Sequence, residues 1–254
     1  MKWYGLVLWL LCVGLEGLLL VRSWRAPWLR KYPFFFGYVA CVFIQDLFFL
    51  LIYFFRFSYY RPIYWWGEFF SLILGCAVSW EIFRLVLGRY PGAGRMARNV
   101  LLLALTVVFT SGLSKLWNGE LLWPSTALEL ERNLRAIQAL ALVVLSLVCV
   151  YYEVPVGRNV KGIFGGYGLF IGMSVVTLTL RAYFGTVFQA GWVFLQPFCY
   201  TAVLLIWCSS LWKYEIALPS HVEPRLEADY RSFVLGTRRG LLQARAFLGK
   251  AMRP

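Results

Sequence analysis

The chain has 254 residues, 61% of them hydrophobic and 19% aromatic, and it carries a formal net charge of +13. Soluble domains average roughly 45–50% apolar residues, and the excess here is gathered in blocks of about 20 residues, the length of helix that crosses a bilayer. These blocks exclude a transmembrane β-barrel, whose strands alternate over about 10 residues, and they leave no room for a separate soluble domain of ordinary size.

Seven apolar blocks follow one another along the chain and predict an all-α, polytopic integral membrane seven-helix bundle. The predicted spans are 3–21, 33–55, 63–87, 99–117, 134–153, 163–184 and 190–212. The connections between them are short and rich in Pro, Gly and Arg. We therefore expect a bundle over 1–217 and a basic amphipathic cytoplasmic tail over 218–254.

The distribution of basic residues predicts the orientation. The first, third and fifth connections and the tail hold 18 of the 25 Lys and Arg residues, and the opposite side holds seven. Because Lys and Arg favour cytoplasmic loops, the tail is predicted to be cytoplasmic and, with an odd number of spans, the N-terminus lies outside. We expect a multi-pass protein of the cell membrane. The membrane that we favour is the bacterial inner membrane. Basic residues placed to orient spans argue against nucleic-acid binding.

Polar residues inside the spans are the candidate functional residues, because a charge near the bilayer centre costs roughly 2.5–3.5 kcal/mol on insertion scales. One set maps toward the outer half of the bundle. It comprises Asp46, Glu68, Arg132, Arg135, Gln138, Arg181 and Gln196. Arg135 and Gln138 share a helix face with Glu131, at spacings of four and seven residues.

Two interpretations of this outer set remain open. Arginine makes planar, bidentate contacts with carboxylates and phosphates, and the Tyr and Trp residues at the same level could wall a pocket for an apolar body. This interpretation predicts an outward-facing site for a small anionic or amphiphilic ligand. In the alternative, the charges pair with each other between helices and the aromatic residues form an interfacial belt.

A second set of charged residues is a candidate for a switch or a proton relay. It comprises Glu16, Asp46, Glu81 and Arg84. Glu81 and Arg84 are three residues apart, so a structural salt bridge at the membrane edge is the alternative.

The last two spans and the tail contain three local signals. Gly168 and Gly172 form a GxxxG motif, which permits close approach of a second helix. Pro197 predicts a kink in the last span, since proline removes a backbone hydrogen bond. Residues 224–250 predict an amphipathic helix, either lying on a leaflet with anionic headgroups or docking a separate cytoplasmic or membrane partner protein.

Several kinds of chemistry have no support in the sequence. The chain has one histidine, His221, and its six cysteines form no CxxC pair, so we predict no metal site and no cofactor. No Walker, HExxH or GxSxG motif occurs, and the last span lacks the central lysine of a retinal protein. We therefore expect a protein that is not an enzyme.

The arrangement resembles the seven-helix input modules of bacterial sensor proteins in its outside N-terminus, short loops and basic cytoplasmic end. The resemblance is one of topology and rests on no residue motif. It implies a receptor-like protein, and because no kinase or cyclase domain follows the tail, the signal would pass to a separate partner. An accessory or assembly subunit of a larger membrane complex is a second hypothesis, and a small proton-coupled transporter is a third.

Overall fold

The chain is all-helical in the computed structural model, which describes residues 3–24, 28–55, 60–117, 123–213 and 224–251, although some side chains within these ranges, among them those of Glu68 and Arg181, lie outside the description. The helices are α1 (Trp3–Trp24), α2 (Trp28–Lys31), α3 (Pro33–Phe55), α4 (Tyr60–Leu87), α5 (Pro91–Trp117), α6 (Trp123–Tyr151), α7 (Arg158–Ser210) and α8 (Pro224–Ala251). No strand occurs in these ranges.

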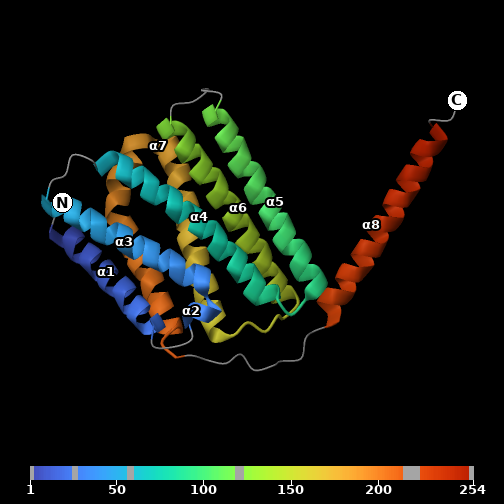
Figure 1. The fold of residues 1–254 in the computed structure, drawn as a ribbon, viewed down its shortest axis with the longest axis horizontal. Helices are drawn as coiled ribbons and strands as arrows, with labels where there is room; N and C mark the ends of the chain where they lie inside the picture. The colour runs from blue at the N-terminus through green and yellow to red at the C-terminus, as the bar shows by residue number, and fades with distance from the viewer. Residues whose placement is uncertain (1–2, 25–27, 56–59, 118–122, 214–223, 252–254) are drawn as a thin grey trace.

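Six of the helices contain a segment that is long and apolar enough to cross a membrane, which indicates a multi-pass membrane protein. The segments are Gly5–Trp24, Pro33–Ile52, Phe70–Leu87, Pro91–Gly112, Leu130–Tyr151 and Arg158–Leu180. They lie side by side in one bundle (Figure 1), in which α1 packs against α3 and α7, and α4, α5 and α6 follow in sequence. A shorter apolar segment, Leu195–Ser210, forms the end of α7.

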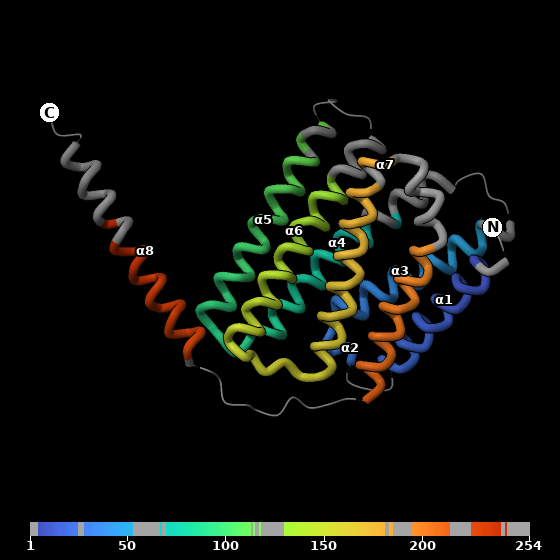
Figure 2. The backbone as a smooth tube through the Cα atoms, turned by 180° about the vertical axis from the view of Figure 1, so that it is seen from behind, coloured from blue at the N-terminus to red at the C-terminus, as the bar shows by residue number. Residues whose placement is uncertain are grey.

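Helix α7 reverses its direction within its own length. A straight helix of 53 residues would span about 80 Å at 1.5 Å per residue. Instead, the Asn159 amide donates hydrogen bonds to the carbonyl oxygens of Ser210 (2.9 Å) and Lys213 (2.8 Å). The first and last parts of α7 therefore lie next to each other, as the yellow and orange arms in Figure 2 show.

The two arms of α7 approach each other at small residues. A Cβ atom on Gly162 would overlap the Ser210 side chain, and one on Gly166 would overlap the Trp207 indole. Gly168 and Gly172, the predicted GxxxG pair, have no described atom within 4 Å of an added Cβ. Within the chain, the close approach of helices therefore occurs at Gly162 and Gly166, and approach of a second chain at Gly168 and Gly172 stays a prediction.

Helix α5 begins eight residues before the predicted span, in a segment whose Pro and Gly residues predict a connection. Pro91 is its first residue, where a fixed φ suits a helix and no N–H group is needed. A Cβ on Gly94 would overlap the Leu87 carbonyl, so this glycine permits the tight α4–α5 turn.

Helix α8 is attached to the bundle through its first turns. Gly92 N donates to Glu227 Oε2 at 3.3 Å, and Tyr152 OH donates to Asp229 Oδ2 at 3.0 Å. Leu226 is buried, whereas Phe233, Leu235 and Leu242 are more than half exposed. Beyond these contacts the helix projects away from the bundle (Figures 1 and 2).

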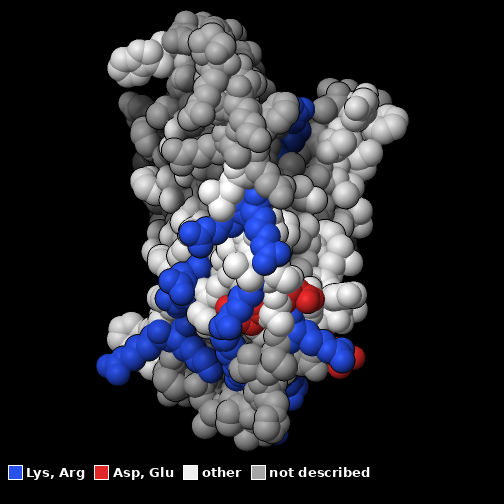
Figure 3. Space-filling model, turned by 90° about the vertical axis from the view of Figure 1, so that its right-hand side faces the viewer, with Lys and Arg blue, Asp and Glu red and all other residues white. Residues whose placement is uncertain are grey.

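Basic side chains gather at one end of the bundle, where α4 turns into α5 and where α7 begins and ends. Figure 3 shows Lys and Arg side chains gathered over the lower half of the face that it draws. We refer to this end as the basic end.

Candidate functional site

Arg135 lies at the junction of α4, α6 and α7 and is buried, with 8% of its surface exposed. Its Nε donates to Glu131 Oε1 at 2.8 Å, one turn earlier on α6. Its guanidinium carbon lies 5.3 Å from the ring centroid of Phe170 on α7. The positive charge of Arg135, which would be unfavourable in a bilayer, is therefore balanced by a carboxylate and by the face of an aromatic ring.

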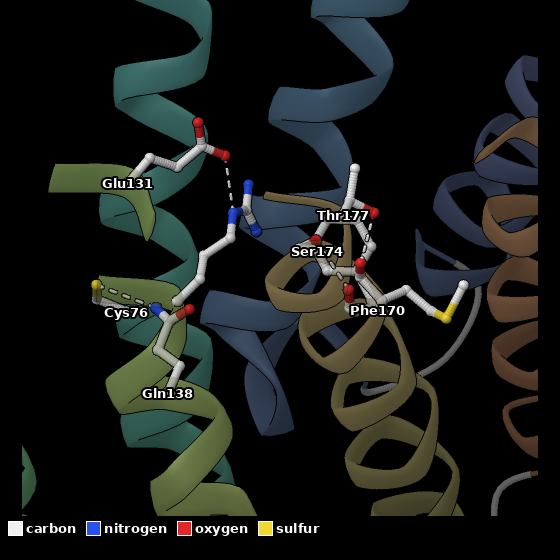
Figure 4. Close-up of polar contacts among 8 residues, drawn as sticks. Cys76, Glu131, Gln138, Phe170, Ser174 and Thr177 are labelled. Carbon is white, nitrogen blue, oxygen red and sulfur yellow. Dashed lines mark hydrogen bonds and ion pairs between the residues drawn. The ribbon is translucent and has the colours of Figure 1, made fainter. Parts of the chain in front are cut away.

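Gln138 extends the same face of α6 toward α4. Its Nε2 lies 3.2 Å from Cys76 Sγ (Figure 4), while its Oε1 is buried without a hydrogen-bond partner among the described residues. Close by, Tyr167 OH of α7 donates to the Gly75 carbonyl of α4 at 2.6 Å. We call Glu131, Arg135, Gln138, Cys76 and Phe170 the Arg135 cluster.

Of the other outer residues of the predicted set, the structure describes the side chains of Arg132, Gln196 and Asp46. Arg132 and Gln196 are exposed on the bundle surface. The side chains of Glu68 and Arg181 lie outside the described residues. The structure thus brings together Arg135 and Gln138, with Glu131, and these are the residues whose helical spacing placed them on one face.

Asp46 belongs to a different group of polar residues, between α1, α3 and α7. It accepts a hydrogen bond from the Trp9 side chain and interacts electrostatically with Glu16. Glu16 is fully buried, and its Oε1 accepts a hydrogen bond from Tyr200 OH at 2.5 Å. Its Oε2 is buried without a hydrogen-bond partner in the described part of the chain.

A sulfur–hydroxyl contact joins the same three-helix region. Cys12 Sγ lies 3.3 Å from Thr201 Oγ1, whose own hydroxyl also bonds the Pro197 carbonyl at 2.7 Å. We call Glu16, Asp46, Tyr200, Cys12 and Thr201 the Glu16 cluster. Within the ranges described, neither Glu16 nor Asp46 forms an ion pair with a basic residue.

Glu81 has a structural environment that accounts for its burial. Its Oε2 accepts the Phe35 N–H at 2.8 Å, and its Oε1 lies 3.4 Å from the Phe34 nitrogen. These N–H groups belong to the first turn of α3, where a negative charge is favoured by the helix dipole. Arg84 Nη2 is 3.6 Å from Glu81 Oε1, so the predicted pair forms, although the carboxylate mainly caps α3.

Sequence reasoning missed the partners that come from distant parts of the chain. Tyr200 and Tyr167 look like ordinary interfacial or core aromatics in the sequence, and only the packing of α7 brings them to Glu16 and Gly75. Asn159 was likewise missed. A polar residue at the start of a helix gives no sign that it bonds carbonyls more than 50 residues away.

Two of the cavities in the described structure border α5, and the second of them is lined in part by Cys76 of the Arg135 cluster. One, of about 750 Å³, lies between the start of α5 and α8 and is lined by Arg95, Tyr230 and Arg231 among others. The other, of about 460 Å³, lies between α4 and α5, and Leu134 of α6 contributes to it. No group of three His, Cys, Asp or Glu residues that could hold a metal ion occurs in the described residues.

No family model, curated protein or solved structure matches the chain. Any functional conclusion therefore depends on the geometry of the two clusters and on the charge distribution.

Proposed function

We propose that the chain is a non-catalytic, receptor-like or sensor-like membrane protein that binds a small anionic or amphiphilic ligand at the Arg135 cluster. We propose seven spans, with the N-terminus outside and the tail in the cytoplasm. The return of α7 along itself supports the seventh span. The concentration of Lys and Arg at the basic end supports the orientation.

One observation carries the ligand proposal: the buried Arg135 guanidinium shares a face of α6 with the buried Gln138 amide oxygen, which has no hydrogen-bond donor among the described residues. The carboxylate of Glu131 occupies the position that a ligand carboxylate or phosphate would take. An incoming anion would compete with Glu131 for the guanidinium, and a ligand hydroxyl could donate to Gln138 Oε1. Because Arg135 also lies over Phe170, this exchange would change a contact between α6 and α7.

The test is a titration of the purified full chain with hexyl phosphate and hexanoate, followed by calorimetry, with hexanol as the uncharged reference. We expect the anions to bind and hexanol not to bind. Glu131→Gln removes the competing carboxylate and is expected to tighten anion binding by about tenfold, the value of one charge-assisted hydrogen bond. Arg135→Ala is expected to abolish it.

Arg132→Ala is the matched control, because Arg132 is an exposed arginine three residues away on the same helix. Its binding should equal that of the unmodified chain. If Arg135→Ala does not fold, Arg135→Lys replaces it, since lysine keeps the charge but loses the bidentate geometry. Unchanged binding in both Arg135→Lys and Glu131→Gln, or no anion binding by the unmodified chain, would refute the proposal.

The Glu16 cluster supports a second candidate, a small proton-coupled transporter. Two carboxylates interact within the bundle, and one oxygen of Glu16 is buried without a partner in the described structure. Such carboxylates are typical of proton pathways through membrane proteins. Proton flux into liposomes that contain the full chain, followed with an enclosed pH dye, should fall in Asp46→Asn. Flux that is equal in Asp46→Asn and the unmodified chain would remove this candidate.

A further inference from the structure

The cavity between α4 and α5 is a groove with an apolar floor and a rim that faces outward. Its floor consists of buried Leu72, Leu105 and Leu134. Its rim includes Ile73, Leu102 and Thr106, all exposed. Its volume of about 460 Å³ falls within the roughly 300–1,000 Å³ of ordinary small-ligand pockets.

The groove lies within the two segments apolar enough to cross a membrane, Phe70–Leu87 and Pro91–Gly112. In a bilayer its open side faces hydrocarbon, where water would find almost no hydrogen-bonding partners. An acyl chain of a surrounding lipid is therefore the molecule that we expect to occupy this groove.

Two arginines flank the end of the groove that is nearer the basic end of the bundle. Trp80 lines the groove there, and the Arg98 guanidinium carbon lies 5.2 Å from the centroid of the Trp80 ring. Arg84, one turn after Trp80 on α4, has 43% of its side chain exposed. Arg98 Nε bonds the Gly94 carbonyl at 3.2 Å, which holds this side chain along α5.

The local charge at this end is positive. Glu81 is the carboxylate beside Arg84, but it is 1% exposed and engaged by the backbone N–H groups of α3. Its separation of 3.6 Å from Arg84 makes a weak pair. The groove is thus apolar along its length and cationic at one end, which is complementary to a lipid with an anionic headgroup.

We propose that the α4–α5 groove binds an anionic phospholipid of the leaflet at the basic end. One acyl chain lies over Leu105 between the two helices, and the phosphate contacts Arg98 and Arg84 on either side of Trp80. Cys76, which lines the groove, also contacts Gln138 of the Arg135 cluster. The contacts of the lipid with Leu105, Arg98 and Arg84 nevertheless do not depend on the ligand proposed at that cluster.

The experiment measures lipid retention by native mass spectrometry. The full chain is purified in an uncharged maltoside detergent and incubated with equal amounts of dioleoyl phosphatidylglycerol and dioleoyl phosphatidylcholine. We expect preferential retention of one phosphatidylglycerol. Arg98→Gln is expected to reduce that retention by about tenfold, since it removes a charge-assisted contact. It should leave the retention of phosphatidylcholine unchanged.

Arg95→Gln is the matched control. Arg95 is one turn before Arg98 on α5, also bonds a carbonyl four residues back, and lines the other cavity. Its retention of phosphatidylglycerol should equal that of the unmodified chain. Equal retention of the two lipids, or equal losses in Arg98→Gln and Arg95→Gln, would show non-specific surface lipid and overturn the proposal.

A second variant tests the groove independently of the charges. Ala77 lines the groove, and Ala77→Phe fills part of it. We expect this variant to lose phosphatidylglycerol although both arginines are intact. If Arg98→Gln does not yield folded protein, Ala77→Phe alone tests the site. Undiminished retention of phosphatidylglycerol in Ala77→Phe would refute it.

Discussion

At the scale of single residues, burial of a carboxylate has different consequences at Glu81 and Glu16. Both oxygens of Glu81 face backbone N–H groups at the start of α3, which no residue of α3 itself could satisfy. Glu16 has one oxygen on Tyr200 and one without a partner in the described residues. The first arrangement stabilises the fold, whereas the second leaves an acceptor available for a proton or a donor.

Glu81→Ala is expected to lower the free energy of unfolding by about 1–3 kcal/mol, because buried N–H groups of α3 lose their acceptor. Reversible denaturation in mixed micelles, followed by circular dichroism, measures this change. Arg84→Gln removes only the exposed partner and should cost about 0–1 kcal/mol. Equal losses in the two variants would mean that the ion pair, and not the cap, matters.

At the scale of helices, the end of α6 is closed by a Schellman motif. Val154 N donates to the Cys149 carbonyl at 3.0 Å, and Glu153 N donates to the Val150 carbonyl at 3.4 Å. Glu153 has a φ of 46°, in the left-handed region that favours glycine. The motif turns the chain so that Val154 is buried and α7 can begin at Arg158.

Glu153→Gly is expected to raise the free energy of unfolding by about 1 kcal/mol, since it relieves the strain of the left-handed conformation. Glu153→Ala is the matched control, because it removes the same side chain and keeps the strain. The same denaturation experiment applies. A gain in Glu153→Ala as large as that in Glu153→Gly would show that the carboxylate was unfavourable, and not the backbone.

Gly166→Ala is expected to lower the free energy of unfolding by about 1–3 kcal/mol, because the new methyl group overlaps the Trp207 indole across the two arms of α7. Gly165→Ala should be neutral or slightly stabilising, since no described atom lies within 4 Å of its Cβ position. A comparison of the midpoints of thermal unfolding separates the two. Equal midpoints would contradict the close approach of the arms.

At the scale of the whole molecule, the bundle has one end rich in basic side chains, and α8 starts at that end (Figure 3). If the tail is cytoplasmic, green fluorescent protein fused after Pro254 will fluoresce, because it folds only in the cytoplasm. Alkaline phosphatase inserted at 118–122, between α5 and α6, will be active, because it requires the outside. The reverse pattern would invert the proposed orientation.

Sequence reasoning predicted the apolar helices well, because bilayer thickness fixes their length. It predicted the face shared by Glu131, Arg135 and Gln138, because helical spacing is local. It placed the start of α5 too late, since Gly and Pro near Pro91 resemble a loop until their contacts with Leu87 and α8 are known. It could not pair Glu16 with Tyr200, because that contact depends on how α7 folds back beside α1.

The double hydrogen bond of Asn159 also sets an order in time for the assembly of α7. Asn159 is 2% exposed. Both hydrogen bonds that its side-chain amide donates require carbonyl groups that the ribosome adds more than 50 residues later. A chain that is truncated before Ser210 would lack both of these carbonyl acceptors. The two arms of α7 can therefore be joined at Asn159 only after residues 210–213 have been synthesised.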